Sequence, residues 1–316
     1  MADNKIYTIE DIKQAASEGR CPEILYSLDS IYRTSILTNF VFERLEHKNQ
    51  FIRNVYNFNG MNWNQTLYIM LMRTIMGFDN REVSMELSQR VTLNMIVRES
   101  RVQQYLEALL LGASGLLELY SSTDPYIKRL KDEFEHFAYK YDIKPMKASD
   151  WRTTKIYPQN HPTLRLVQLA ACMYNNNVTI QRIVECMSKQ DVYDMFSGEI
   201  SEYWVTNFIP RRQNASAARR IGKLKSDLMG INFVAQIMFA YGNFIGSDSL
   251  ISRALNLLED IPAEDNRYVR RWNVYGPITK SSLDSQALIE LTREYCIPGR
   301  CEECHLARYL IHRQDK

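Results

Sequence analysis

VQQYLEALLLGASGLLELY, from Val102 to Tyr120, is the stretch that decides the fold. Its apolar residues lie on nearly all sides of a helical wheel, which is typical of a helix buried in the centre of a domain. We therefore predict a buried central helix here. The segment that contains Gly112 and Gly115 has neither the lysine nor the preceding strand that a phosphate-binding loop requires. We expect these two glycines to let two helices approach closely.

The helical pattern continues on both sides of this run. Only 12 glycines and 9 prolines interrupt the 316 residues, and between them apolar residues recur at helical rather than alternating spacing. One long irregular stretch, Ile143 to Pro162, carries three prolines and indicates a boundary. The sequence predicts an all-α fold with no substantial sheet, made of two packed, irregular helical subdomains. The first covers residues 1–145, and the second covers residues 146–316 and ends in a cysteine-containing turn and a last helix.

Composition and charge exclude several classes of protein. Hydrophobic residues make up 45% of the chain and charged residues 24%, which is ordinary for a globular protein. The formal net charge is +2, so no global attraction to nucleic acid or membrane follows. The amino terminus lacks an apolar signal region, and the apolar runs are shorter than a membrane span. We expect a cytoplasmic protein without a membrane partner, and the sequence leaves its oligomeric state open.

Three cysteines lie close together near the carboxyl end, in the stretch EYCIPGRCEECHLARYLIHR. Thiols stay reduced in the cytoplasm, so these residues are more naturally free or metal-bound than disulfide-bonded. Cys301 and Cys304 have the spacing of a metal-binding pair, and Cys296 is a third ligand if the chain folds back at Pro298 and Gly299. The hypothesis is a structural zinc ion or iron–sulfur cluster at Cys296, Cys301 and Cys304. The alternative is three small buried residues in a tight turn, with no cofactor.

A fourth ligand for such a site is missing locally. Zinc in a closed structural site takes four ligands. His305 follows Cys304 directly and points elsewhere on a helix. Cys172, Cys186 and His312 are candidates only if the fold brings them close to the three cysteines.

The stretch YPQNHPTLRLVQLA, residues 157–170, places a cation in the first turn of a predicted helix. Pro162 suits the first helical position, and Asn160 can accept amide protons at the helix start. Arg165 opposes the helix dipole there, so a compensating anion is expected nearby. An internal Asp or Glu is the favoured partner. The alternative is an anion-binding site made by the helix start and Arg165.

Two further stretches concentrate basic residues. The segment IPRRQNASAARRIGKLK has no acid between Glu202 and Asp227, and on a helix Arg212, Arg219 and Lys223 form one strip that can follow a phosphate backbone. In EDNRYVRRWNVYG, three arginines accompany three aromatic residues at helical spacing, and we favour a core position for the aromatic residues. The candidate nucleic-acid-binding residues are Arg165, Arg211, Arg212, Arg219, Arg220, Lys223, Arg267, Arg270 and Arg271.

No familiar catalytic motif occurs in the sequence, so we predict no catalytic residues. The leading hypothesis is a non-catalytic helical module that binds nucleic acid through a local basic face. A protein-interaction scaffold with an acidic protein partner is the second hypothesis. An enzyme or redox protein that uses the carboxyl-terminal cysteines is the third.

Several stretches together resemble one bacterial family, the domain of unknown function 2851. They occur in the same order from about residue 30 to the end of the chain. The stretches are LTNFVFERLEHKNQFI, NWNQTLYIMLMRTIMGFDN, EALLLGASGLLE, YPQNHPTLRLVQLA, IPAEDNRYVRRW and DSQALIELTREYCIPGRCEECHLARYL.

The resemblance implies no established activity. It implies that members carry an additional, nuclease-like amino-terminal part rich in Asp, Glu and His, followed by a helical part similar to this chain. We therefore expect a stand-alone helical module without the catalytic carboxylates of that part. The cysteine spacing also resembles that of the family, which favours the metal hypothesis.

Overall fold

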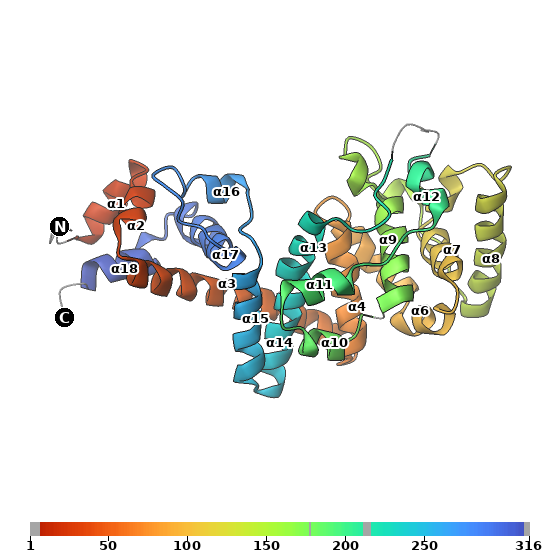
Figure 1. The fold of residues 1–316 in the computed structure, drawn as a ribbon, viewed down its shortest axis with the longest axis horizontal. Helices are drawn as coiled ribbons and strands as arrows, with labels where there is room; N and C mark the ends of the chain where they lie inside the picture. Colours follow the sequence, from red (N-terminus) through yellow and green to blue (C-terminus); the bar gives the residue numbers. More distant parts are fainter. Residues whose placement is uncertain (1–6, 177, 211–215, 313–316) are drawn as a thin grey trace. The chain divides into compact units, whose positions relative to one another are not determined.

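A computed structural model describes residues 7–176, 178–210 and 216–312 of the chain (Figure 1). The regular structure of these residues is helical, and the one pairing of β type among them is an isolated bridge between Pro262 and Ser281. The predicted all-α fold is therefore confirmed.

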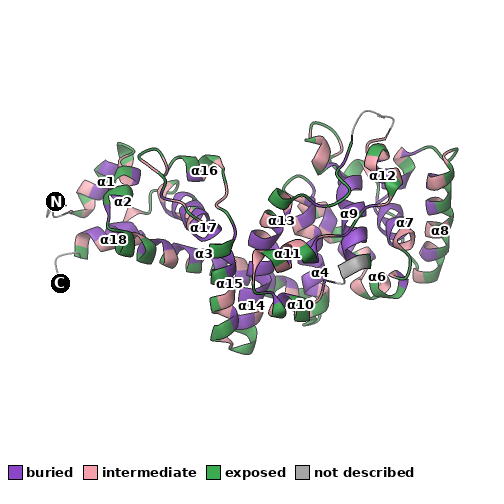
Figure 2. Cartoon of the chain, in the orientation of Figure 1, coloured by how far each residue is buried: buried purple, intermediate pink, exposed green. Residues whose placement is uncertain are grey.

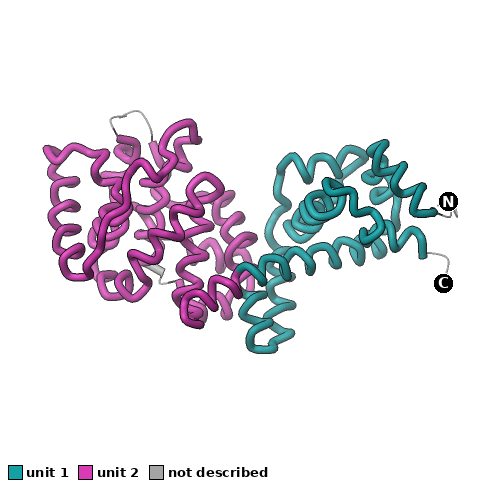
Figure 3. Tube along the Cα trace, turned by 180° about the vertical axis from the view of Figure 1, so that it is seen from behind, with its two compact units in different colours: residues 1–51, 238–316 teal, residues 52–237 magenta. Residues whose placement is uncertain are grey.

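The chain divides into two compact units, which Figure 3 shows in different colours. Unit 1 combines residues 1–51 with residues 238–316, and unit 2 consists of residues 52–237. The predicted boundary after residue 145 does not coincide with this division. The proline-containing stretch lies inside unit 2, where the Met146 amide donates to the Ala113 carbonyl and the Trp151 indole donates to the Ser114 carbonyl.

Unit 1 joins the two ends of the chain. The short helices at its amino end pack against the last helix and the turn before it. Thr8 caps the first of these helices, because its hydroxyl accepts from the Asp11 amide while the Asp11 carboxylate accepts from the Thr8 amide. The unit contains α1 (Ile9–Ser17), α2 (Cys21–Ser27), much of α3 (Ser30–Phe58) and α14 (Ala235–Ile245), α15 (Asp248–Asp260), α16 (Arg267–Arg270), α17 (Ser282–Glu290), the π-helical η5 (Leu291–Cys296), η6 (Cys301–Glu303) and α18 (His305–His312).

Unit 2 is built around α7 (Gln103–Ala113), which packs against α8 and α9. Its other elements are α4 (Trp63–Met76), α5 (Arg81–Arg90), α6 (Leu93–Glu99), η1 (Leu116–Leu119), α8 (Pro125–Tyr141), η2 (Ala148–Asp150), η3 (Pro158–Asn160), α9 (Pro162–Asn176), α10 (Ile180–Glu185), α11 (Lys189–Met195), α12 (Glu202–Asn207), α13 (Lys223–Met229) and the π-helical η4 (Gly230–Val234).

The predicted central helix is buried, as Figure 2 shows, but it is shorter than the apolar run. It ends at Ala113, because Gly115 adopts a left-handed conformation with a φ of 75°. Gly112 lies at a close contact between two helices, as predicted, whereas Gly115 lies against irregular backbone and not against a second helix. A Cβ atom on Gly112 would lie 2.0 Å from the Phe134 ring of α8, and one on Gly115 would lie 2.1 Å from the Met146 carbonyl oxygen.

One charged side chain lies within this apolar run. Glu107 is fully buried, and its carboxylate accepts hydrogen bonds from the Tyr126 hydroxyl and the Trp204 indole, each at 2.7 Å. The Ser201 hydroxyl donates at 2.5 Å and the Gln103 amide at 3.3 Å. Burial raises the pKa of Glu107 despite these four donors. The network joins α7, α8 and α12, so it organises the interior of unit 2.

A continuous helical run, Lys223–Ile245, is long and apolar enough to cross a membrane by length and composition. The structure buries 67% of its most apolar window, as expected of a core helix in a globular protein. Length and composition alone are weak grounds for a membrane span.

Candidate functional site

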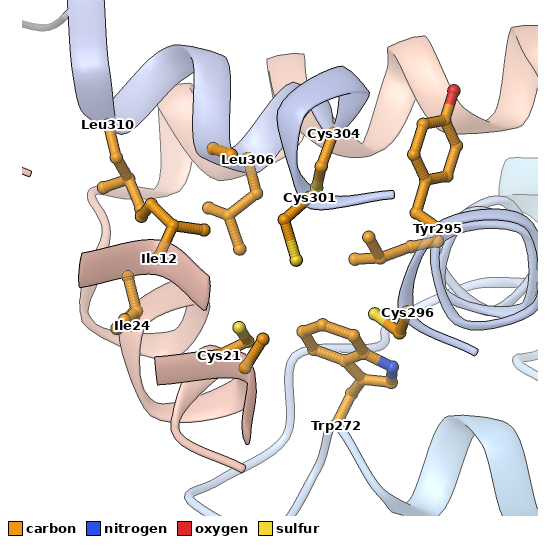
Figure 4. Close-up of a pocket in the computed structure, with 13 residues that line it drawn as sticks. Ile12, Cys21, Ile24, Trp272, Tyr295, Cys296, Cys301, Cys304, Leu306 and Leu310 are labelled. Atoms are coloured by element: carbon orange, nitrogen blue, oxygen red, sulfur yellow. The ribbon is translucent and has the colours of Figure 1, made fainter. Parts of the chain in front are cut away.

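Four cysteines line one small cavity of unit 1, with a volume of about 30 Å³ (Figure 4). Cys296 ends η5, while Cys301 and Cys304 belong to the turn that contains η6. Cys21 is the first residue of α2. The predicted cluster of three cysteines is therefore gathered around a cavity, and a fourth cysteine from the opposite end of the chain joins it.

Cys21 was not among the fourth ligands considered from the sequence. It comes to the cavity because α1 and its neighbour α2 pack together, and α1 in turn packs on η6 and α18. No local spacing signals this contact. The three residues that were considered do not line the cavity: Cys172 and Cys186 belong to unit 2, and His312 is an exposed residue at the end of α18.

The surroundings of the four thiols are apolar. The remaining lining comes from aliphatic and aromatic side chains such as Ile12, Leu291 and Trp272. Burial, with a smaller contribution from neighbouring thiols, raises the pKa of Cys21 to about 11 and that of Cys296 to about 12. Cys21 and Cys296 are therefore neutral thiols at pH 7 in the absence of a cation. In the described parts of the chain, no three His, Cys, Asp or Glu side chains are placed to hold one metal ion.

A second candidate site lies at the start of α9 in unit 2, around Arg165. This side chain is 7% exposed, and it donates to the amide oxygens of Gln168 and Asn160 at 2.9 and 2.8 Å. Its Nε atom is buried without a partner. Burial lowers the pKa of Arg165 to about 10. The favoured internal carboxylate is not found: within the described residues Arg165 has neutral partners, and Asn160 binds the arginine instead of capping the helix.

A second cation approaches Arg165 from α13. The Lys225 ammonium donates to the Thr74 carbonyl at 3.1 Å. Burial and then repulsion from Arg165 lower the pKa of Lys225 to about 7. Nearby, His161 is 2% exposed, its Nδ1 atom has no partner, and burial lowers its pKa to about 4. Two cationic side chains thus lie near the start of α9, the buried Arg165 and the half-buried Lys225, and no carboxylate pairs with either among the described residues.

The depressed pKa of Lys225 predicts how stability depends on pH. Between about pH 7 and its usual value of 10.5, the unfolded chain binds a proton that the folded chain does not. The free energy of unfolding therefore rises with pH across that window. Below about pH 7 the destabilisation caused by burying the charged Lys225 is at its largest. We expect Lys225→Met to stabilise the protein more at about pH 6 than at about pH 9, as measured by urea unfolding. Lys223→Met, on an exposed residue of the same helix, should show no such pH dependence.

The basic run before α13 is only partly described, since Arg211 and Arg212 lie outside the described residues. Residues 216–222 are not helical, so the predicted strip of cations on one helix face does not form there. Arg219 forms an ion pair with Glu202, and Arg220 pairs with Glu199 through two nitrogens. These pairs are exposed and contribute little to stability. Lys223 is exposed at the first position of α13.

The other basic stretch belongs to unit 1 and forms only the short helix α16. Arg270 pairs with Asp265, and Arg267 stacks on Tyr268 with its guanidinium 4.7 Å from the ring centre. Trp272 is 1% exposed and its indole donates to the Thr292 hydroxyl, so this aromatic residue belongs to the core as favoured. The same expectation is wrong for Tyr275, which is 46% exposed, and Tyr268 is only half-buried. Arg271 is exposed and lies near enough to Cys21 and Cys296 to lower their pKa values slightly.

A groove of about 440 Å³, lined by both acidic and basic side chains, also lies in unit 1. Its lining includes Glu43, His47 and Tyr295. Glu43 accepts hydrogen bonds from the Tyr295 hydroxyl at 2.5 Å and pairs with His305 at 2.7 Å, while His47 pairs with the buried Glu290. These side chains hold η5 and α18 against α3, so their contacts have a structural explanation.

The described residues thus form two compact helical units, with a thiol-lined cavity in one and, in the other, the pair of the buried Arg165 and the half-buried Lys225. A family model described as "Protein of unknown function (DUF2851)" matches residues 1–267. The chain therefore belongs to the DUF2851 family, as the resemblance predicted. The matched region includes Cys21 and Arg165 and ends before Cys296. No curated protein and no solved structure gave a match.

Proposed function

We propose that this protein binds nucleic acid, and that Arg165 and Lys225 of unit 2 receive a backbone phosphate. The pairing of the buried Arg165 with the half-buried Lys225, with no carboxylate partner among the described residues, supports this most directly. Burying an uncompensated charge costs several kcal/mol. The positive charge at this site therefore favours binding of an anion. A phosphate supplies the negative charge and the acceptor oxygens that Arg165 Nε and the Lys225 ammonium can use.

The surroundings of the pair favour a polymer over a small phosphate compound. The Gln159 amide of η3 donates to the Ser216 carbonyl at 3.0 Å, which holds the basic run beside the start of α9. Arg219, Arg220 and Lys223 follow within this run. Their exposed charges suit successive phosphates of a backbone, and the ion pairs with Glu202 and Glu199 are weak enough to be exchanged for phosphate.

Fluorescence anisotropy with labelled single-stranded and duplex oligonucleotides tests the proposal. We expect binding at about 50 mM salt that weakens steeply toward about 200 mM, because phosphate contacts release counterions. Arg165→Gln and Lys225→Gln should each weaken binding about tenfold or more, since a hydrogen bond between charged groups contributes about 1.5–3 kcal/mol. Arg152→Gln is the matched control, because Arg152 is an exposed arginine of unit 2 paired with Asp79.

Circular dichroism of each variant should show unchanged helix content. Absence of binding at low salt, or equal affinity in the Arg165 variant and the control, would contradict the proposal. The alternative of an acidic protein partner gives a different result. A protein captured by the chain would then survive nuclease treatment and be lost when Arg219 and Arg220 are both replaced.

A further inference from the structure

We propose that Cys21, Cys296, Cys301 and Cys304 bind one metal centre through four thiolates. The centre is a zinc ion or a four-iron cluster, since these are the metal groups that four cysteines hold. This proposal concerns unit 1 and does not depend on nucleic-acid binding by unit 2.

The first argument is convergence. Four of the six cysteines of the chain line a single cavity of about 30 Å³. They come from α2, from the end of η5 and from the turn around η6, and Figure 4 shows their sulfur atoms around the same space. Cysteine is often buried as a small apolar residue. That explanation predicts scattered cysteines, as Cys172 and Cys186 are, and it does not predict four in one cavity.

The second argument is the backbone around the turn. Gly299 adopts a left-handed conformation with a φ of 74°, and the Arg300 amide then donates to the Tyr295 carbonyl. This reversal brings Cys301 back toward Cys296. The backbone amides of Leu306 and Ala307 lie close to the Cys304 sulfur. Amide-to-sulfur hydrogen bonds are a regular feature around metal-bound thiolates.

The third argument is charge. Four thiolates around a doubly charged zinc ion or cluster leave a net charge of −2. Arg271 is exposed and lies close to Cys21 and Cys296. It therefore offsets part of that charge.

The two centres differ in what they require of the sulfur atoms. A zinc ion at about 2.3 Å from each sulfur needs neighbouring sulfurs about 3.8 Å apart, so the side chains must close inward from their present positions. In a four-iron cluster each thiolate binds a different iron, so the sulfurs need not meet at one point, but the cavity must widen. Either centre would link α2 to the carboxyl-terminal turn, and so connect the two chain segments that form unit 1.

The experiment is elemental analysis and visible spectroscopy of the full chain purified without chelators and without oxygen. We expect about one zinc per chain with no colour, or about four irons with a visible band that bleaches on reduction. X-ray absorption of the wild-type protein should show sulfur neighbours at the metal, about four per zinc or, for a cluster, sulfide and thiolate sulfur at each iron. This measurement does not depend on any variant folding.

Variants then identify the fourth ligand. Cys21→Ser is expected to lose most of the bound metal, to the same extent as Cys301→Ser. Cys186→Ser should retain it, because Cys186 is a buried cysteine of unit 2 whose thiol donates to the Ser188 carbonyl, a role that serine can fill. A metal-free wild-type chain that takes up neither zinc nor reconstituted iron and sulfide would overturn the proposal. Full metal content in Cys21→Ser would overturn the assignment of Cys21.

Discussion

Replacing Glu107 with alanine is expected to lower the free energy of unfolding by about 5 kcal/mol, the largest effect of any single substitution considered for this chain. The carboxylate is fully buried and accepts from four side chains. Removing it leaves the buried Trp204 indole and the half-buried Tyr126 and Ser201 hydroxyls without this acceptor. Each unsatisfied buried donor costs about 1–3 kcal/mol, and the missing side chain adds a cavity.

Urea unfolding followed by tryptophan fluorescence measures this effect. Glu118→Ala is the matched control, because Glu118 lies in the next element along the chain and is exposed. Its replacement should change the free energy of unfolding by less than about 0.5 kcal/mol. If the Glu107 variant unfolds at the same urea concentration as the control, the four hydrogen bonds do not organise unit 2 in the way described.

The sequence predicted the fold class because helix formation leaves a local signal. Apolar residues spaced for a helix gave the buried run around α7. Glu107 was not singled out, since a single acid within an apolar run has no local partner. Its donors are Tyr126 of α8, Ser201 just before α12 and Trp204 of α12, and only the packed structure brings them together.

The division into units could not be predicted for a related reason. Prolines mark irregular backbone, and the stretch from Ile143 to Pro162 is indeed largely irregular. Irregular backbone is a boundary only when few contacts cross it, and here Asn80 binds both the carbonyl and the amide of Arg152. Unit 1 is formed by the two ends of the chain, and no local pattern indicates that pairing.

The candidate sites show the same limit. Cys296, Cys301 and Cys304 were found from their spacing, while Cys21 required the packing of the first helices on the last ones. Arg165 was found from its position in a helix start. In place of the expected carboxylate, two amide oxygens accept its hydrogen bonds, and a second cation, Lys225, lies nearby. Sequence patterns therefore located chemically unusual residues, and the structure supplied their partners.

The second large effect is expected at the end of α7, where Gly115→Ala should destabilise the protein by about 3–4 kcal/mol. Two costs add there. A side chain at a φ of 75° costs about 1–2 kcal/mol. The new Cβ atom would also lie 2.1 Å from the Met146 carbonyl oxygen, so the backbone of that segment must move. That movement strains the hydrogen bond from the Met146 amide to the Ala113 carbonyl, which holds the irregular stretch against α7.

Gly60→Ala separates the two costs, because Gly60 is in the same unit with a φ of 64° and no atom within 4 Å of its added Cβ. This control should lose only the conformational part, about 1–2 kcal/mol. Thermal unfolding of the two variants should therefore differ clearly, with Gly115→Ala the less stable. Equal melting temperatures would mean that the segment at Met146 gives way freely, and the stretch from Ile143 to Pro162 would then be only loosely attached to the core that α7 forms.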